Sequence, residues 1–212
     1  MNSQRKNSPI KTDAAINKNH KTDPYTSKKL SITSSLLIAV SAVLFVISLH
    51  FPWWKMLFIA PQYPEGLNII VYPNKLEGQI DIINGLNHYI GMKNFSAKNF
   101  PELSYLSYLG WGLAAFTLLT AILRKKLVLY ILIVGLVLGG TLGVLDLHKA
   151  LHDFGTNLDP HAPIKIAPFV PPILGQNRVA NFITHSSLGY GAYFLIAGFM
   201  LLLIPLWKDR KK

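Results

Sequence analysis

Four long apolar stretches alternate with polar segments along this chain. They are residues 31–51, 104–123, 127–147 and 188–207. A hydrocarbon core of roughly 30 Å needs about 20 helical residues to cross it, and each stretch reaches that length. None holds an internal Lys, Arg or Glu, and the only acid, Asp146, lies at the end of the third stretch. The pattern predicts four membrane-spanning helices.

The polar segments differ in character. Residues 1–30 are rich in Asn, Lys, Ser and Thr without periodicity, which predicts a disordered tail. The turn 124–126 is so short that the helices it joins must be antiparallel neighbours. Two long loops, residues 52–103 and 148–187, lie at the other ends of the helices, and residues 208–212 form a basic tail.

The first long loop is expected to carry structure of its own. Residues 51–54, Phe-Pro-Trp-Trp, are typical of an aromatic belt at the membrane interface. Two β-like runs, 67–72 and 76–83, flank Pro73-Asn74 and predict a hairpin. Residues 81–92 then fit a short helix with an apolar stripe.

The second long loop is rich in proline, which favours extended chain over helix. Both loops contain β-branched and aromatic residues that need a place to bury, and neither can build a good core alone. We therefore expect the loops to pack on each other. The predicted fold class is an all-α membrane protein: a four-transmembrane-helix bundle with a small extracytoplasmic cap, made of a β-hairpin, a short helix and the Pro-rich second loop.

The net charge of +11 lies entirely on one side of the predicted bundle. The two tails and the turn 124–126 hold fourteen Lys or Arg and three Asp, a balance of +11. The first long loop is neutral, and the second is neutral when Asp146 at its border is counted with it. Basic segments stay on the cytoplasmic side of membranes. The distribution predicts a bacterial inner-membrane protein with both termini cytoplasmic. It favours contact with anionic lipid headgroups over nucleic-acid binding.

The residue composition excludes several kinds of cofactor and transport site. The chain has no cysteine, which excludes disulfides, thiolate metal sites and covalent haem attachment. No histidine lies in the interior of a predicted membrane helix, since His50 is at the end of the first, so we expect no membrane haem. A transport path is not indicated either, because no charge lies at mid-membrane.

Two residue pairs could bind a metal. His148 and His152 stand at i and i+4, the spacing at which two imidazoles on one helix face can share a metal. His88 and Met92 have the same spacing, and a nitrogen with a thioether favours copper. The alternative for both pairs is chance spacing, with histidines that bind only water, a carbonyl or a headgroup. A shared site would require His88 to approach the outer end of the third helix.

Three glycines recur at every fourth position in the third apolar stretch: Gly135, Gly139 and Gly143. Such spacing lets another helix approach closely. The partner helix could belong to this chain or to a second copy, and chance is the alternative, because glycine is common in membrane helices.

Two strings in the long loops resemble a family of multi-span bacterial membrane proteins associated with nitrous oxide reductase and copper-protein maturation. One string is residues 83–92, INGLNHYIGM; the other begins at residue 153, DFGTNLDP, and continues through PPILG at 171–175 to Asn181-Phe182. The resemblance covers both loops and the third helix. It implies an envelope accessory protein, with copper as its candidate metal.

The leading hypothesis is therefore an inner-membrane accessory protein for an envelope cuproenzyme, which handles copper or supports assembly. Its metal-binding residues would be His88, Met92, His148 and His152. The alternative is a scaffold subunit that binds only lipid and a membrane or periplasmic protein, without metal. A third hypothesis, an enzyme or electron-transfer subunit, would require a cofactor, and no catalytic motif supports it.

Overall fold

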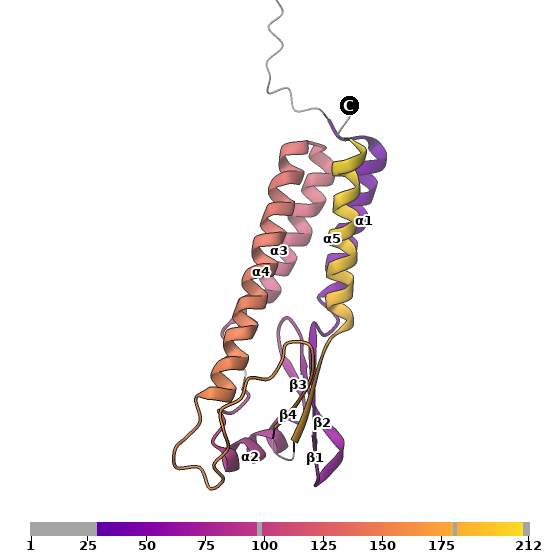
Figure 1. The fold of residues 1–212 in the computed structure, drawn as a ribbon. Helices are drawn as coiled ribbons and strands as arrows, with labels where there is room; N and C mark the ends of the chain where they lie inside the picture. Colours follow the sequence, from indigo (N-terminus) through magenta and orange to yellow (C-terminus); the bar gives the residue numbers. More distant parts are fainter. Residues whose placement is uncertain (1–28, 97–98, 180–181, 210–212) are drawn as a thin grey trace, which may run out of the picture.

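The computed structural model describes residues 29–96, 99–179 and 182–209 (Figure 1). Most of the predicted disordered tail, residues 1–28, and residues 210–212 of the basic tail lie outside these ranges. The described residues form a helical bundle that continues at one end into a domain built around a β-sheet (Figure 1).

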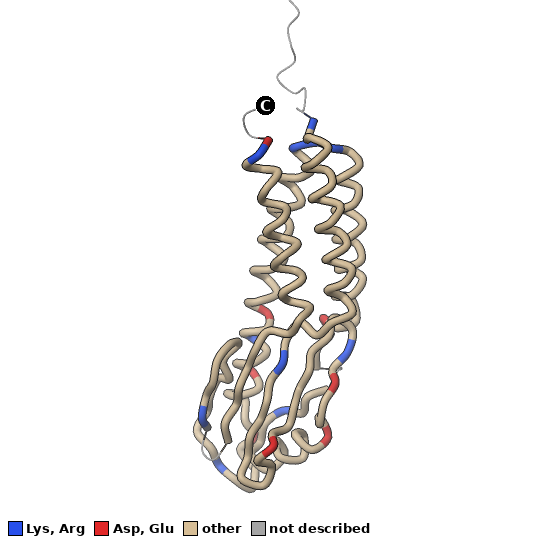
Figure 2. Tube along the Cα trace, turned by 90° about the vertical axis from the view of Figure 1, so that its right-hand side faces the viewer, with Lys and Arg blue, Asp and Glu red and all other residues tan. Residues whose placement is uncertain are grey.

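The bundle contains four helices: α1 (Ile32–Ser48), α3 (Glu102–Leu123), α4 (Lys126–Thr156) and α5 (Tyr190–Lys208). Helices α3, α4 and α5 are each long and apolar enough to cross a membrane, and α1 is a shorter apolar helix of 17 residues. Charged residues gather at the two ends of the bundle and leave its middle bare (Figure 2). The chain is therefore a membrane protein.

The sheet domain takes strands from both long loops. The first loop supplies β1 (Trp54–Ala60), β2 (Tyr63–Val71), β3 (Leu76–Gly78) and the helix α2 (Ile80–Ile90). The second supplies β4 (Gly175–Val179) and β5 (Phe182–Leu188). All neighbours are antiparallel in the order β3-β2-β1-β5-β4.

The prediction of an all-α fold with a small cap is wrong, because this five-stranded sheet organises the whole domain. The hairpin around Pro73-Asn74 and the helix after it are present, but β1, β4 and β5 were missed. Strand β1 begins at Trp54, inside the segment interpreted as an aromatic belt. Its pairing with β5 joins residues more than a hundred positions apart, which no local pattern reveals.

The expectation that the two loops pack on each other is confirmed. Side chains of both loops share one core under the sheet, where the rings of Phe95 and Phe154 stack with centroids 4.4 Å apart. Phe154 belongs to α4, which runs to Thr156 and not to the expected residue 147. At about 1.5 Å per residue, the extension carries α4 well past the bundle and into the domain core.

Small residues bring α1 close to its neighbours. Ser34, Ser41 and Ser48 recur every seven residues on α1 and are fully buried. A Cβ atom added at Gly198 of α5 would lie 2.6 Å from the Phe45 ring, and one at Gly110 of α3 would lie 2.3 Å from the Leu49 side chain. Close backbone approach is what small residues permit in membrane bundles.

Helix α4 is attached differently. Its buried residues lie only near its two ends: Leu129, Leu132 and Ile133 at one, and Leu151, Phe154 and Gly155 at the other. Every residue from 137 to 146 is exposed. A Cβ atom added at Gly135, Gly139 or Gly143 would meet nothing within 4 Å, so this glycine face packs against no described part of the chain.

The two kinds of glycine predict opposite responses to enlargement. Gly198→Leu should lower stability by about 1–3 kcal/mol, because the new side chain would displace the Phe45 ring in a filled interface. Gly139→Leu should leave the unfolding temperature of the monomer in detergent unchanged. Thermal unfolding of both variants beside the parent protein checks this. Equal destabilisation by the two changes would contradict the packing described for α4.

Candidate functional site

The end of α2 separates His88 from Met92. The expected i and i+4 geometry requires the helix to run through residue 92, but α2 ends at Ile90 and Gly91 adopts the left-handed conformation, with φ of 76°. His88 therefore stays exposed on α2, with its ring edge against Tyr89 at 6.3 Å between centroids. Met92 turns into the core and is 5% exposed.

Two asparagines of the same string hold the chain after Gly91 in place. The Asn84 side chain accepts from the Phe95 backbone N–H at 2.6 Å and donates to the Phe95 carbonyl at 2.8 Å. The buried Asn87 donates to the Lys93 carbonyl at 3.3 Å. These bonds draw residues 92–95 back across α2, which explains why the Met92 thioether lies among apolar side chains.

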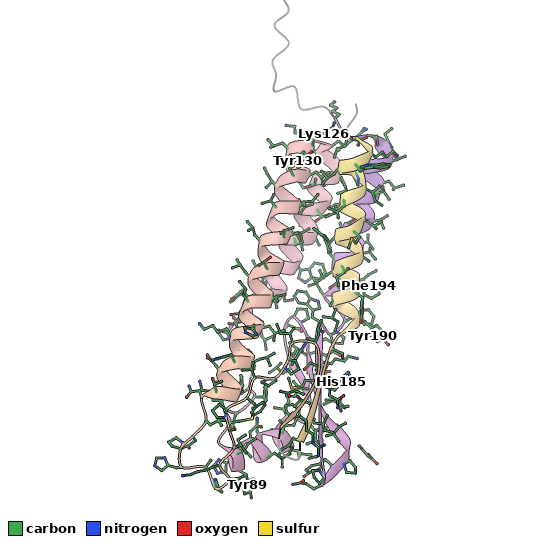
Figure 3. All side chains as sticks on the ribbon, in the orientation of Figure 1. Tyr89, Lys126, Tyr130, His185, Tyr190 and Phe194 are labelled. Carbon is green, nitrogen blue, oxygen red and sulfur yellow. The ribbon has the colours of Figure 1, made fainter. Side chains whose placement is uncertain are left out.

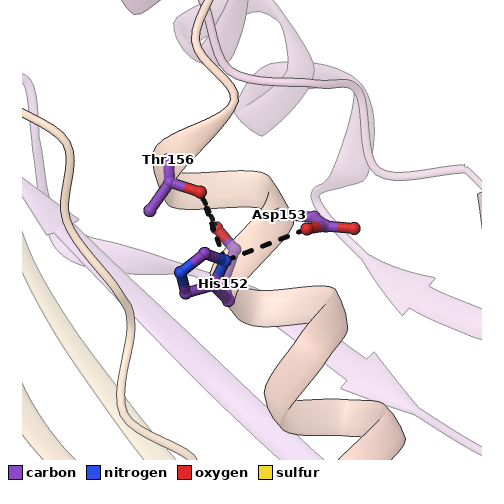
Figure 4. Close-up of polar contacts among 3 residues, drawn as sticks. All are labelled: His152, Asp153 and Thr156. Carbon is purple, nitrogen blue, oxygen red and sulfur yellow. Dashed lines mark hydrogen bonds and ion pairs between the residues drawn. The ribbon is translucent and has the colours of Figure 1, made fainter.

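His148 and His152 lie one turn apart on the extension of α4 beyond the bundle, and both are exposed. The Nδ1 atom of His152 lies 3.3 Å from the Thr156 hydroxyl oxygen and 3.9 Å from an Asp153 carboxylate oxygen (Figure 4). The Thr156 hydroxyl also donates to the His152 carbonyl at 2.8 Å. These contacts orient one imidazole and leave its Nε2 atom available.

A fourth histidine, His161, pairs with an acid at the tip of the domain. Its backbone N–H donates to Asp159 Oδ1 at 2.8 Å, and its ring Nδ1 lies 3.3 Å from the same oxygen. The backbone hydrogen bond from His161, aided by its ring and by the charge of the more distant His88, lowers the pKa of Asp159 below its usual value. Both side chains are largely exposed.

The described residues contain no group of three or more His, Cys, Asp or Glu side chains placed to hold one metal ion. Within the same residues, no hydrogen bond, ion pair or ring contact joins His88 to His148 or His152. Of the four predicted metal-binding residues, only the α4 pair retains the spacing from which it was inferred.

The two strings that carry the family resemblance contact each other. The Asp159 backbone N–H donates to the Gly91 carbonyl at 2.8 Å, and the Ile164 N–H donates to the Tyr89 carbonyl at 2.9 Å. A Cβ atom at Gly91 would lie 2.9 Å from the Asp159 backbone. Residues of both strings therefore hold the second loop against α2.

The face of the sheet opposite α2 is a surface that the sequence analysis missed. We call it the open sheet face and define it by three cross-strand rows. They are Glu77–Ile70–Lys55–Ser187, Asn68–Leu57–His185–Gln176, and Ile59–Ile183–Arg178. Figure 2 views the domain from this side, and Figure 3 labels His185 on β5.

Apolar side chains occupy the middle of the open sheet face. Leu57, Ile59, Ile70 and Ile183 are half-buried, and none belongs to either hydrophobic core of the described structure. Burial alternates strictly along β1 in the structure, and a matching alternation of polar and apolar residues would have been the signal in the sequence. It was obscured because Lys55 is the only charge in a strand whose outward residues are otherwise apolar.

A scan against models of known protein families found no match for this chain, and a search of curated proteins found no relative. The resemblance to copper-maturation membrane proteins therefore stays a prediction from the two loop strings.

Proposed function

We propose that this chain is an accessory protein of the bacterial inner membrane that supports assembly by presenting its sheet domain to a partner protein outside the cytoplasm. The open sheet face is the observation that carries the proposal. Its mixture of a central apolar group with polar and charged residues around it has the composition of a protein–protein interface.

The proposal includes α1 as a fourth membrane crossing. This helix packs along α5 and α3 and so lies in the same layer (Figure 1). Exposed aromatic residues support the placement of that layer. Tyr190 and Trp207, at opposite ends of α5, are separated by about 26 Å at 1.5 Å per residue, close to the thickness of a hydrocarbon core. The one-sided positive charge supports a cytoplasmic location for both termini in this proposal.

Topology can be measured with single cysteines, because the chain has none of its own. In intact cells, Asn74→Cys and Gln176→Cys should react with a membrane-impermeant maleimide, since both lie on the sheet-domain side. Lys125→Cys, in the turn between α3 and α4, should react only after the cells are opened. Labelling of Lys125→Cys in intact cells, or protection of Asn74→Cys, would overturn the topology.

The docking surface can be tested with a photo-crosslinking amino acid at Ile59 or Ile183, which are paired in the open sheet face. Each should give a discrete crosslinked product in cells. The matched control carries the photo-crosslinking amino acid in place of Tyr89, which is 56% exposed but lies on α2. Absence of a product from both sheet positions, or the same product from Tyr89, would refute docking on this face.

Copper handling is the second candidate function, and the exposed His148 and His152 on adjacent turns of α4 favour it. Two imidazoles at this spacing can share one metal. Protein purified without added metal should then contain copper in proportion to chain, by elemental analysis. His148→Ala and His152→Ala should each remove it, while His161→Ala should not. If the parent protein contains no metal, copper handling is refuted and only the scaffold function remains.

The glycine face of α4 suggests that the scaffold is itself assembled from two copies. Gly135, Gly139 and Gly143 lie open on α4, which contains the most apolar segment among the three helices long enough to span a membrane, and a helix of a second copy could approach there closely. In this case Gly139→Leu reduces the oligomer size in detergent while the unfolding temperature stays constant. An unchanged size would remove glycine-mediated association from the proposal.

A further inference from the structure

A small cavity lies at the basic end of the bundle, between the start of α4 and the end of α5. Its volume is about 90 Å³. It is lined by Leu30, Lys126, Leu129, Tyr130, Pro205, Leu206 and Asp209. Figure 3 labels Lys126 and Tyr130 at this end, beside the last turn of α5. A cavity of this size can hold a small polar group.

Asp209 is buried in the wall of this cavity. It ends α5, and only 2% of its surface is exposed. One carboxylate oxygen, Oδ2, accepts from the Ser31 backbone N–H at 3.1 Å at the start of α1, where the helix dipole favours a negative charge. The other oxygen, Oδ1, is buried without a hydrogen-bond partner among the described residues.

The surroundings of Asp209 favour the charged form of its carboxyl. Burial by itself raises the pKa of Asp209, but the nearby Ser34 hydroxyl, the backbone N–H and hydroxyl of Ser31, and the charge of Lys126 together outweigh it. The net effect lowers the pKa of Asp209 below its usual value. A buried, ionised oxygen without a donor is costly, so a ligand that brings N–H donors to Oδ1 would gain binding energy there.

The remaining lining residues indicate which other groups such a ligand would carry. The Lys126 ammonium donates to the Asp209 carbonyl and, with three N–H groups, retains donors for an anion. Tyr130 is half exposed at the same end and also lines the cavity. Leu129 and Leu206 provide apolar surface toward the bundle. A cation for Asp209, an anion for Lys126 and Tyr130, and an apolar continuation describe a zwitterionic phospholipid.

We propose that this cavity binds the headgroup of a phospholipid that carries a primary ammonium beside its phosphate, of the phosphatidylethanolamine class, in the leaflet at the basic end of the bundle. The ammonium donates to Asp209 Oδ1, and the phosphate lies between Lys126 and Tyr130. The site goes beyond the scaffold function and is independent of whether the sheet domain binds metal or protein.

Headgroup methylation tests the proposal on the unmodified full-length protein. The protein in detergent is titrated with phosphatidylethanolamine, its N-methyl and N,N-dimethyl derivatives and phosphatidylcholine of identical chains, and bound lipid is counted by native mass spectrometry. The series removes N–H donors one at a time, so affinity should fall at each step, by about tenfold or more in total, the equivalent of one charged hydrogen bond. Equal binding across the series would overturn the proposal.

A matched pair of variants locates the site. Asp209→Asn should abolish the preference for phosphatidylethanolamine over phosphatidylcholine. Lys125→Gln, which removes an exposed base of the same turn outside the cavity lining, should preserve it. Unfolding temperatures measured on the same samples show whether each variant is folded. If Asp209→Asn does not fold, the lipid methylation series on the parent protein still tests the proposal.

Two further ligands separate competing explanations. Phosphatidylglycerol, which is anionic and has no amine, should bind more weakly than phosphatidylethanolamine in the parent protein; stronger binding would mean that the basic end merely attracts negative charge, and would overturn the proposal. Glycerophosphoethanolamine has the headgroup without acyl chains. It should not displace the lipid at equal concentration, and displacement would refute a lipid as the occupant.

Discussion

The pairing of β1 with β5 is the contact on which the rest of this structure depends. Strand β1 follows α1 and strand β5 precedes α5, so the antiparallel packing of the two helices continues directly into an antiparallel pair of strands. The junction leaves no room for side chains. A Cβ atom at Gly189 would lie 2.1 Å from the Pro52 carbonyl oxygen, while the Gly189 N–H donates to the Trp53 carbonyl at 3.0 Å.

This junction explains why burial is uneven among the helices. Because α1 and α5 are tied together by the sheet, they pack closely along their length, and α3 packs on α1 through small residues. Helix α4 enters the domain core by Leu151 and Phe154 and is held near its start by Leu129 and Ile133. Its middle is left to lipid or to another helix. The residues that could bind a metal, a lipid or a partner protein therefore lie on surfaces that the β1–β5 contact leaves exposed.

The two predicted metal-binding pairs show that local backbone conformation determines whether two side chains can share a ligand. Both had helical spacing, but only the pair on α4 lies within one continuous helix. Gly91 ends α2 between His88 and Met92, and the Asn84 side chain then turns the chain inward. The sequence contained this signal, since glycine is the usual residue for a left-handed helix end. A spacing of four is evidence for a shared ligand site only where the helix continues.

Three membrane segments, the hairpin around Pro73-Asn74 and the short helix after it could be predicted from the sequence, because each depends on residues close together in the chain. The apolar runs had to be buried in lipid or protein whatever their partners. The five-stranded sheet, the open sheet face and the cavity beside Asp209 could not be predicted in the same way. Each joins segments from opposite ends of the chain: Trp54 meets Leu188, and Ser31 meets Asp209. Only the tertiary structure decided which distant partners met, because the β1–β5 hydrogen bonds and the contact between Ser31 and Asp209 depend on position in space and leave no periodic pattern in the sequence.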